Sequence, residues 1–264
     1  MKKNCIKILI SIVIIVSSIL VGCNVEKVEN PITRIGIIGA MDEEVDILKK
    51  SANITNITKI AEMEFCEAEL NNKNVVIVKC GMGKVNAGIC AHTLINIFNC
   101  NKIINTGVAG SLDNKLNIGD IVVSVDAVQH DYDVSEIGFK KGEIPYTGLY
   151  AFPADEDMRS VAKEVLNKSD LNIKYYEGRI CSGDQFISTK EEKYNITSNF
   201  GGLCCEMEGA AIAQVCYLNK TPYLIIRAIS DKDDAAENVE YELFKEDSAK
   251  NSATIVSGII DKLD

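Results

Sequence analysis

The sequence predicts an α/β fold in three layers, αβα, with a mixed, twisted sheet at the centre. From Arg34 onward, short β-branched runs alternate with stretches of helical periodicity, which is the pattern of a sheet covered by helices on both faces. The polar segment LNNKN at 70–74 is typical of a hairpin turn, so the sheet is expected to be mixed rather than wholly parallel. The 264 residues, 47% of them apolar, suffice for one large core.

Each element is predicted from its local pattern. Runs rich in β-branched residues that end at turn residues predict strands at 34–39, 64–70, 74–79, 102–106, 119–126, 176–182, 203–207 and 222–229. Apolar residues spaced by three and four predict helices at 42–51, 84–98, 155–168, 190–196, 208–219 and 241–263. Small residues and carboxylates follow several of these strands. Because ligands of open α/β sheets lie outside the carboxyl ends of the strands, this pattern predicts a site for a small, hydroxyl-rich ligand.

Composition argues against nucleic acid and against metal as ligands. The formal net charge is −10 and no basic patch is visible, which is unfavourable for binding a polyanion. The 10 cysteines include no C-x-x-C pair, and 2 histidines are too few for the usual zinc patterns. We therefore expect no metal and no cofactor, and we interpret Cys80, Cys90, Cys181 and Cys216 as small buried apolar residues.

The N-terminus is predicted to be a separate targeting segment. A basic start precedes an uncharged apolar run at 8–21, and LVGC at 20–23 resembles a bacterial lipobox, in which the cysteine carries lipid. We expect residues 1–22 to be a lipoprotein signal peptide, 23–33 to be the lipidated Cys23 with a tether, and 34–264 to be a single folded domain. This arrangement predicts an exported protein anchored to the outer face of the bacterial cytoplasmic membrane. An uncleaved N-terminal anchor is the alternative.

Three carboxylates follow the first predicted strand, and one of them is out of place. On a helical wheel, Asp42 and Glu43 fall on the polar side, in the first turn, where the helix dipole favours acidic residues. Glu44 falls between Leu48 and Ile47, inside the apolar arc. A carboxylate on a core-facing stripe is costly unless it has partners or a function. Glu44 is therefore a candidate catalytic group.

Buried charges are also expected in the C-terminal half. The helix after Glu208 carries no charge through Leu218, which places Glu206 and Glu208 at an interior rim. Arg227 lies in a continuous apolar strand and needs an acid, for which Glu206 or Glu208 is the natural candidate; a purely structural ion pair is the alternative. Asp231 lies at the end of this strand, and its alternative interpretation is a helix N-cap.

Several motifs occur in a fixed order from about Arg34 to the C-terminus. They are IGIIGAMDEEV, NTG-x-AG, IGDIVVS, HD-x-DV, SGD-x-F, EMEGAAIAQVC and RAISD. Together they resemble the bacterial 5′-methylthioadenosine/S-adenosylhomocysteine nucleosidases, which have a nucleoside phosphorylase-like fold. The resemblance implies hydrolysis of the N-glycosidic bond of an adenine thionucleoside, with 5′-deoxyadenosine as a further candidate substrate. Adenine and the 5-substituted ribose would be released.

The resemblance also implies roles for individual residues. Glu44 would activate the attacking water, and Asp231 would deliver a proton towards adenine N7. Glu208 and Met207 would hold the ribose, with Arg227 nearby. Phe186 would stack on the purine, and the backbone of Ile187 would contact the purine edge. Met41 and Met82 would lie near the ribose and the thioether. The site would also include Ser230, Val108 and Tyr241. A loop that contains Val134, Ile137 and Pro145 would reach into the neighbour's alkylthio pocket, which implies a homodimer.

The sequence departs from the family pattern at three positions. Val108 stands where some members carry Ser, Tyr241 where we expect Phe, and Asp233 where we expect a small residue. These departures bear on substrate preference more than on reaction type. Two alternatives remain open. The first is a purine nucleoside phosphorylase, but its phosphate needs a cationic clamp and the glycine loops contain no Arg. The second is a nucleoside-binding lipoprotein, but binding alone does not need Glu44 and Asp231 together.

Overall fold

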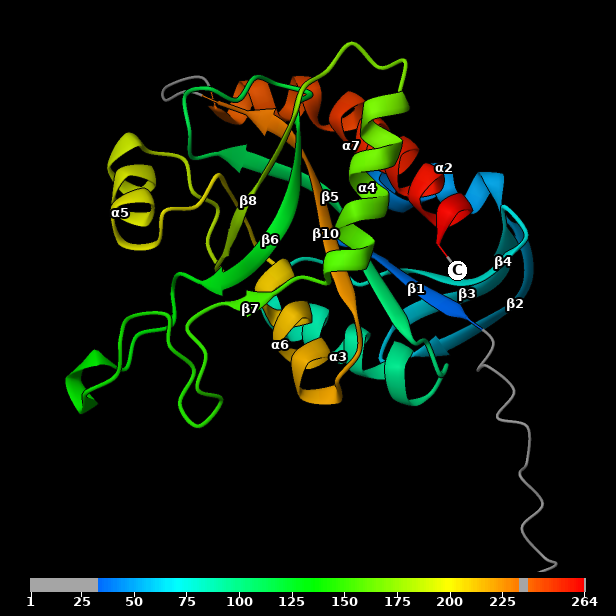
Figure 1. The fold of residues 1–264 in the computed structure, drawn as a ribbon, viewed down its shortest axis with the longest axis horizontal. Coiled ribbons are helices and arrows are strands. Elements are labelled where there is room, and N and C mark those ends of the chain that lie inside the picture. The colour runs from blue at the N-terminus through cyan, green and yellow to red at the C-terminus, as the bar shows by residue number, and fades with distance from the viewer. Residues whose placement is uncertain (1–32, 233–236, 264) are drawn as a thin grey trace, which may run out of the picture. The chain divides into compact units, whose positions relative to one another are not determined.

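The computed structural model describes residues 33–232 and 237–263, which fold around one ten-stranded sheet (Figure 1). Residues from Thr33 onward form one compact unit. The expectations for the signal peptide, the tether, Cys23 and Asp233 lie outside the described residues. The strands are β1 (Arg34–Gly39), β2 (Asn53–Ile60), β3 (Met63–Leu70), β4 (Lys73–Lys79), β5 (Lys102–Ser111), β6 (Ile121–Gln129), β7 (Phe152–Pro153), β8 (Tyr175–Ser182), β9 (Cys204–Glu206) and β10 (Tyr223–Asp231).

Five strands of the sheet close into a ring, four others extend it from β5, and β7 pairs with β6. β5 pairs with β10 and β9, β10 pairs with β6, and β8 pairs with both β6 and β9. From β5 the sheet continues through β1, β4 and β3 to the edge strand β2. The β1–β4 ladder is parallel and the β3–β4 ladder is antiparallel, so the predictions of a mixed sheet and of a hairpin at LNNKN are confirmed.

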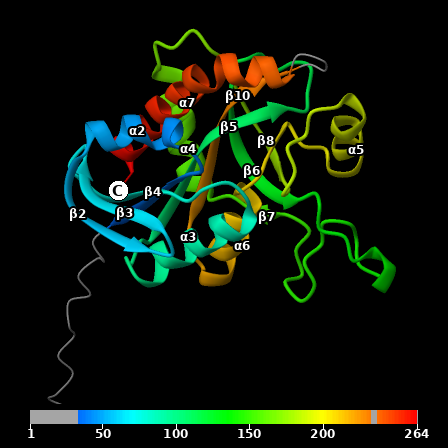
Figure 2. The same cartoon turned by 180° about the vertical axis from the view of Figure 1, so that it is seen from behind.

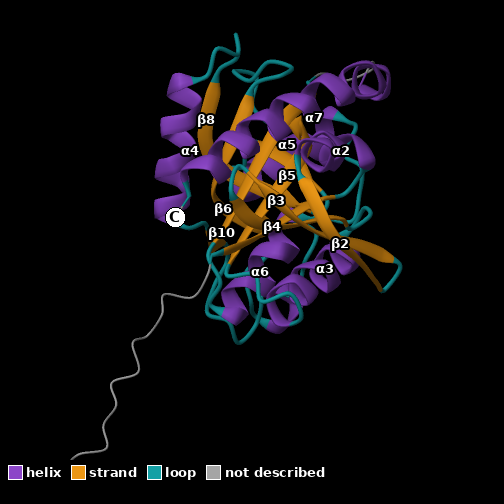
Figure 3. Cartoon of the chain, turned by 90° about the vertical axis from the view of Figure 1, so that its right-hand side faces the viewer, coloured by secondary structure: helices purple, strands orange, loops and turns teal. Residues whose placement is uncertain are grey.

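Helices cover both faces of the sheet, which confirms the three-layer prediction (Figure 3). The helices are α2 (Asp42–Ser51), α3 (Lys84–Asn96), α4 (Glu156–Lys168), α5 (Lys190–Phe200), α6 (Gly209–Asn219) and α7 (Glu237–Lys262), with a 3-10 turn η1 (Ser135–Ile137). On one face α7 packs against β10, β5, α2 and α4. On the other face α3 lies beside α6, as Figure 2 shows from behind. α5 stands to the side of these layers (Figure 1).

Three strands differ most from the prediction, because β2 and the short β7 are not predicted and β5 is longer than expected. The sequence does not predict β2, because NITNITKI lies at the sheet edge with most side chains exposed and so lacks apolar alternation. The expectation that a strand ends at 106 is wrong, because β5 continues to Ser111 through pairing with β10 and β9. The glycine-containing segment 107–110 is therefore strand rather than loop, and it carries its backbone directly into the interior.

The described cysteines serve as apolar filling. Cys80, Cys90, Cys181 and Cys216 are buried and free, which confirms the interpretation from sequence. Burial raises the pKa of the Cys181 thiol to about 12, so it stays neutral and unreactive near neutral pH.

No helix in the described parts of the chain has the length and hydrophobicity that a membrane-spanning helix needs.

Candidate active site

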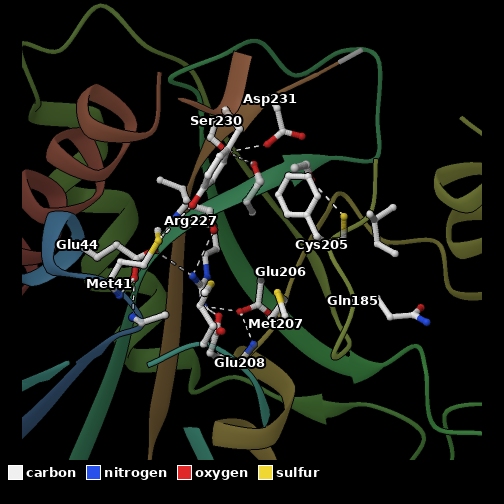
Figure 4. Close-up of a pocket in the computed structure, with 18 residues that line it drawn as sticks. Met41, Glu44, Gln185, Cys205, Glu206, Met207, Glu208, Arg227, Ser230 and Asp231 are labelled. Atoms are coloured by element: carbon white, nitrogen blue, oxygen red, sulfur yellow. Dashed lines mark hydrogen bonds and ion pairs between the residues drawn. The ribbon is translucent and has the colours of Figure 1, made fainter. Parts of the chain in front are cut away.

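A pocket lies at the carboxyl ends of β1, β5, β9 and β10 (Figure 4). Its empty volume, which includes solvent at the open mouth, is about 580 Å³. The structure brings together residues that come from seven separate stretches of the sequence. The predicted residues that line the pocket are Met41, Glu44, Met82, Val108, Phe186, Ile187, Met207, Glu208, Arg227, Ser230, Asp231 and Tyr241.

Glu44 is buried at the start of α2, with 1% of its surface exposed, which confirms the helical-wheel prediction. Its Oε2 accepts hydrogen bonds from the backbone N–H groups of Ala40 at 2.5 Å and Met41 at 3.0 Å. Its Oε1 accepts a hydrogen bond from the Val108 N–H at 3.0 Å. Burial raises the pKa of Glu44, while Arg227 and the three N–H groups oppose this rise. The carboxylate is therefore held in place and is more basic than an exposed glutamate.

Arg227 lies at the centre of the charged cluster and is 1% exposed. Its Nη2 donates hydrogen bonds to the Glu206 carboxylate and, at 2.5 Å, to Asn105 Oδ1. The Glu208 carboxylate lies 3.6 Å from Nη2, and the Glu44 carboxylate lies 3.8 Å from Nη1. The prediction that Arg227 pairs with a buried acid is confirmed. One guanidinium thus faces three carboxylates in an environment with little water, so each of the three carboxylates depends on it.

Glu208 immediately precedes α6 and turns its carboxylate towards α3. Its Oε1 accepts a hydrogen bond from the Gly83 N–H at 2.8 Å, at the start of that helix. Burial raises the pKa of Glu208 to about 7, and the neighbouring Glu206 adds to the rise. Glu206 also accepts hydrogen bonds from the Ser182 hydroxyl and the Gly209 N–H, which fixes the turn into α6. Near neutral pH, Glu208 is thus able to accept or donate a hydrogen bond to a hydroxyl group of a ligand.

Asp231 ends β10 and lies on a different side of the pocket from Glu44 (Figure 4). It is 2% exposed, and its Oδ1 accepts a hydrogen bond from the Ser230 hydroxyl at 2.7 Å. Because Asp231 belongs to the strand and α7 begins only at Glu237, the alternative of a helix N-cap is wrong. Two buried carboxyl groups, Glu44 and Asp231, thus face one cavity from separate elements.

An apolar and aromatic wall completes the pocket. Phe186 is half exposed and makes an edge-to-face contact with Tyr241, with ring centroids 5.5 Å apart. The Tyr241 hydroxyl donates a hydrogen bond to Met41 Sδ at 3.1 Å. Ile187 is buried and Met82 is exposed at the rim. A flat ring with one accessible face offers a stacking surface for a planar ligand.

Three predicted residues are not brought into this pocket. Val134, Ile137 and Pro145 belong to the loop between β6 and β7, which projects from the body of the molecule (Figure 1). Conversely, the sequence singles out no binding role for Gln185 or Cys205, and both line the pocket. The only signal for Gln185 is its position after a predicted strand, and Cys205 lies within one. No group of metal-ligating side chains occurs in the described parts of the chain.

Comparison with known proteins assigns the chain to a family. The family model described as the phosphorylase superfamily matches residues 34–261. The 5′-methylthioadenosine/S-adenosylhomocysteine nucleosidase of Staphylococcus haemolyticus is 40% identical over 227 residues, which are 86% of this chain and 98% of the relative. The chain belongs to this nucleosidase family.

Solved structures of nucleosidases have the same fold. The nucleosidase of Neisseria meningitidis, solved in complex with methylthio-immucillin-A, superimposes with a TM-score of 0.84 at 33% identity, over 88% of this chain and 100% of that chain. Futalosine hydrolase of Helicobacter pylori superimposes with a TM-score of 0.83 at 35% identity, over 88% of this chain and 99% of that chain. The expectation of a nucleoside phosphorylase-like fold is confirmed.

Proposed function

We propose that this nucleosidase hydrolyses the N-glycosidic bond of 5′-methylthioadenosine and S-adenosylhomocysteine, releasing adenine and the 5-substituted ribose. The observation that carries the proposal is the pair of buried carboxyl groups, Glu44 and Asp231, on different sides of one pocket. Its relatives carry the name of this activity. The 5′-deoxyadenosine nucleoside is a further candidate substrate, because it presents the same adenine and ribose.

The two carboxyl groups match the charges that develop as the bond breaks. The electron pair of the C1′–N9 bond leaves with the purine, while the ribose becomes positively charged. Asp231 donates a proton to purine N7, which neutralises the leaving group. Glu44 takes a proton from the water that attacks C1′. Its raised pKa makes it a stronger base than an exposed glutamate. Solvent exchange then returns both groups to their starting states.

The rest of the pocket suits a purine ribonucleoside. Glu208 and Met207 line the pocket and would hold the ribose, and Arg227 lies 3.6 Å from the Glu208 carboxylate. The exposed face of Phe186 would stack on the purine, with the backbone of Ile187 at the purine edge. Met41 and Met82 would provide polarisable contacts for a thioether.

The geometry does not favour phosphate as the nucleophile. A phosphate site needs free N–H donors or cations. At the start of α3, the Gly83 N–H donates to Glu208 at 2.8 Å and the Lys84 N–H donates to Asp184 at 2.8 Å. These donors are already occupied by carboxylates. Glu44 would in addition repel a phosphate, so water is the proposed nucleophile.

The test is adenine release from 5′-methylthioadenosine by the purified protein without phosphate. We expect Glu44→Gln and Asp231→Asn each to lower kcat by about 10²- to 10⁴-fold, the usual contribution of one general acid or base. Asp42→Asn is the matched control, because Asp42 lies in the same helix turn but is exposed and pairs with Lys79 at 2.8 Å. Full activity in either catalytic variant overturns the assignment. Nucleoside binding without any release by the parent would favour a nucleoside-binding lipoprotein.

The active form is proposed to be a homodimer in which the β6–β7 loop of one protomer, with Val134, Ile137 and Pro145, covers the partner's pocket. The exposure of Ile137 supports this, because 72% of its surface is accessible. The exposed Val85 of α3, which follows the pocket residue Met82 in the chain, provides apolar surface for the same contact. Light scattering is expected to give twice the monomer mass, and Ile137→Asp is expected to weaken nucleoside binding. A fully active monomer contradicts this arrangement.

The chain is further proposed to be an exported lipoprotein, anchored through Cys23 to the outer face of the cytoplasmic membrane. Its support is the basic start, apolar run and lipobox-like LVGC of the sequence. The parent is expected to fractionate with membranes, and Cys23→Ala is expected to lose this association. If the Cys23→Ala protein fractionates as the parent does, the lipid anchor is wrong.

A further inference from the structure

A buried lysine from α5 approaches Asp231. Lys193 lies one turn into this helix, and its Nζ is 3.9 Å from Asp231 Oδ2. The same Nζ donates a hydrogen bond to the Lys232 carbonyl at 3.0 Å. The side chains of Lys193 and Asp231 are 11% and 3% exposed, so water screens their interaction weakly. An ammonium group is thus held beside a carboxyl group of the pocket.

We propose that Lys193 is a positioning residue that stabilises the Asp231 carboxylate formed when Asp231 gives its proton to the leaving purine. This inference rests on the proposed function. The transferred proton goes to purine N7 as the C1′–N9 bond breaks, and one negative charge appears on Asp231. Lys193 takes no part in this proton transfer, so it acts on the reaction only through Asp231.

Two described neighbours of Asp231, Ser230 and Cys205, do not provide this charge. The Ser230 hydroxyl is neutral and donates to Oδ1, the oxygen other than the one that Lys193 approaches. The Cys205 thiol of β9 lies near by, and burial raises the pKa of Cys205 so that it also stays neutral. Lys232 follows Asp231 in the chain, but its Nζ donates a hydrogen bond to Asn117 Oδ1 at 3.2 Å.

The sign of the effect follows from the charge. An ammonium group at this distance favours the ionised form of Asp231 and typically moves a carboxyl titration by about one unit or more. Since Asp231 must be protonated to act as an acid, replacing Lys193 by methionine moves the basic limb of the pH–rate profile upward by about one unit. The plateau rate falls by roughly threefold, because the Asp231 carboxylate that forms is less stabilised and Asp231 is the weaker acid.

The experiment compares the parent with Lys193→Met, Lys193→Arg and Lys232→Met. The first readout is the pH profile of kcat/KM for adenine release. The second, which needs no turnover, is the NMR titration of the Asp231 carboxyl carbon in protein with ¹³C-labelled aspartate, assigned with Asp231→Asn. Lys193→Met is expected to raise both midpoints by about one unit. Lys193→Arg keeps the charge and Lys232→Met removes a neighbouring one, and both are expected to stay close to the parent.

The outcomes separate this inference from the proposed function. If both midpoints of Lys193→Met equal those of the parent, the inference is wrong. If Lys232→Met moves them as far as Lys193→Met does, the effect is general surface charge and the inference is also wrong. If the parent releases no adenine, the proposed function fails, and the NMR midpoint alone supports or overturns the Lys193–Asp231 contact.

Discussion

Replacing Arg227 by methionine removes a positive charge on which three buried carboxylates depend. Arg227 donates to Glu206 and lies 3.6 Å from Glu208 and 3.8 Å from Glu44. Methionine fills a similar volume without charge, so the perturbation is mainly electrostatic. The protein is expected to fold at mildly acidic pH and to be strongly destabilised at alkaline pH.

The magnitude follows from the carboxylates that remain. Arg227 lowers the pKa of both Glu44 and Glu208, so its removal raises both pKa values further above the usual range of a glutamate. Removing one partner of a buried ion pair usually costs roughly 3–5 kcal/mol, so the loss of unfolding free energy is expected to reach about 3 kcal/mol or more at pH 8.

The loss must depend on pH with a definite sign. A carboxyl group whose pKa is raised by folding stabilises the folded state at pH values below its pKa in the unfolded chain. This contribution disappears as the pH rises through its pKa in the folded protein. In the parent, Glu208 with a pKa of about 7 makes stability fall between about pH 4.5 and pH 7. In Arg227→Met this fall extends to higher pH, so the difference from the parent grows between about pH 5.5 and pH 8.

Urea unfolding of both proteins at these two pH values, at one protein concentration, measures the effect. Arg179→Met is the control, because Arg179 pairs with Asp126 at 2.7 Å in a partly exposed site. Its removal leaves one carboxylate without its partner instead of three. Its loss is expected to be smaller and equal at both pH values. If Arg227→Met loses the same free energy at both pH values, the account of three coupled carboxylates is wrong.

Three further predictions concern the same cluster. Protonation of Glu208 below its pKa of about 7 removes a hydroxyl acceptor, so KM for the nucleoside is expected to rise as pH falls from 8 to 6 in steady-state assays. Gly107→Ala places a Cβ on the Arg227 guanidinium and the Glu44 carboxylate, and thermal unfolding is expected to show a loss above about 3 kcal/mol. Val108→Ser offers Glu44 a hydroxyl donor, which stabilises its ionised form, so the acidic limb of kcat/KM is expected to move to lower pH. An unchanged KM, melting temperature or acidic limb, respectively, contradicts each prediction.

Local patterns are sufficient to predict most elements and one key side chain. Glu44 stands out because helical periodicity alone places it on the apolar arc, whereas Asp42 is exposed and pairs with Lys79. The buried acid partner of Arg227 is predictable for a similar reason, since a charge inside an apolar strand requires compensation. Periodicity cannot reveal that Arg227 also lies 3.8 Å from Glu44, because that contact joins strands and helices far apart in the chain.

The remaining differences have tertiary causes. β5 continues past its predicted end because strands from the C-terminal half pair with it, and no local pattern contains that information. Gln185 and Cys205 line the pocket only because the ring of strands brings their loops and ends together. The loop with Ile137 lies outside the pocket of its own chain, and its role in a contact between two chains stays a prediction.

The central claim is that water, activated by Glu44, attacks C1′ of an adenine thionucleoside. The most direct measurement is mass spectrometry of the products of 5′-methylthioadenosine turned over in H₂¹⁸O with and without phosphate. We expect equal adenine release with and without phosphate. One ¹⁸O atom is expected at C1 of 5-methylthioribose at early times, before exchange through the open-chain sugar. Release that requires phosphate and yields 5-methylthioribose 1-phosphate without ¹⁸O would contradict it.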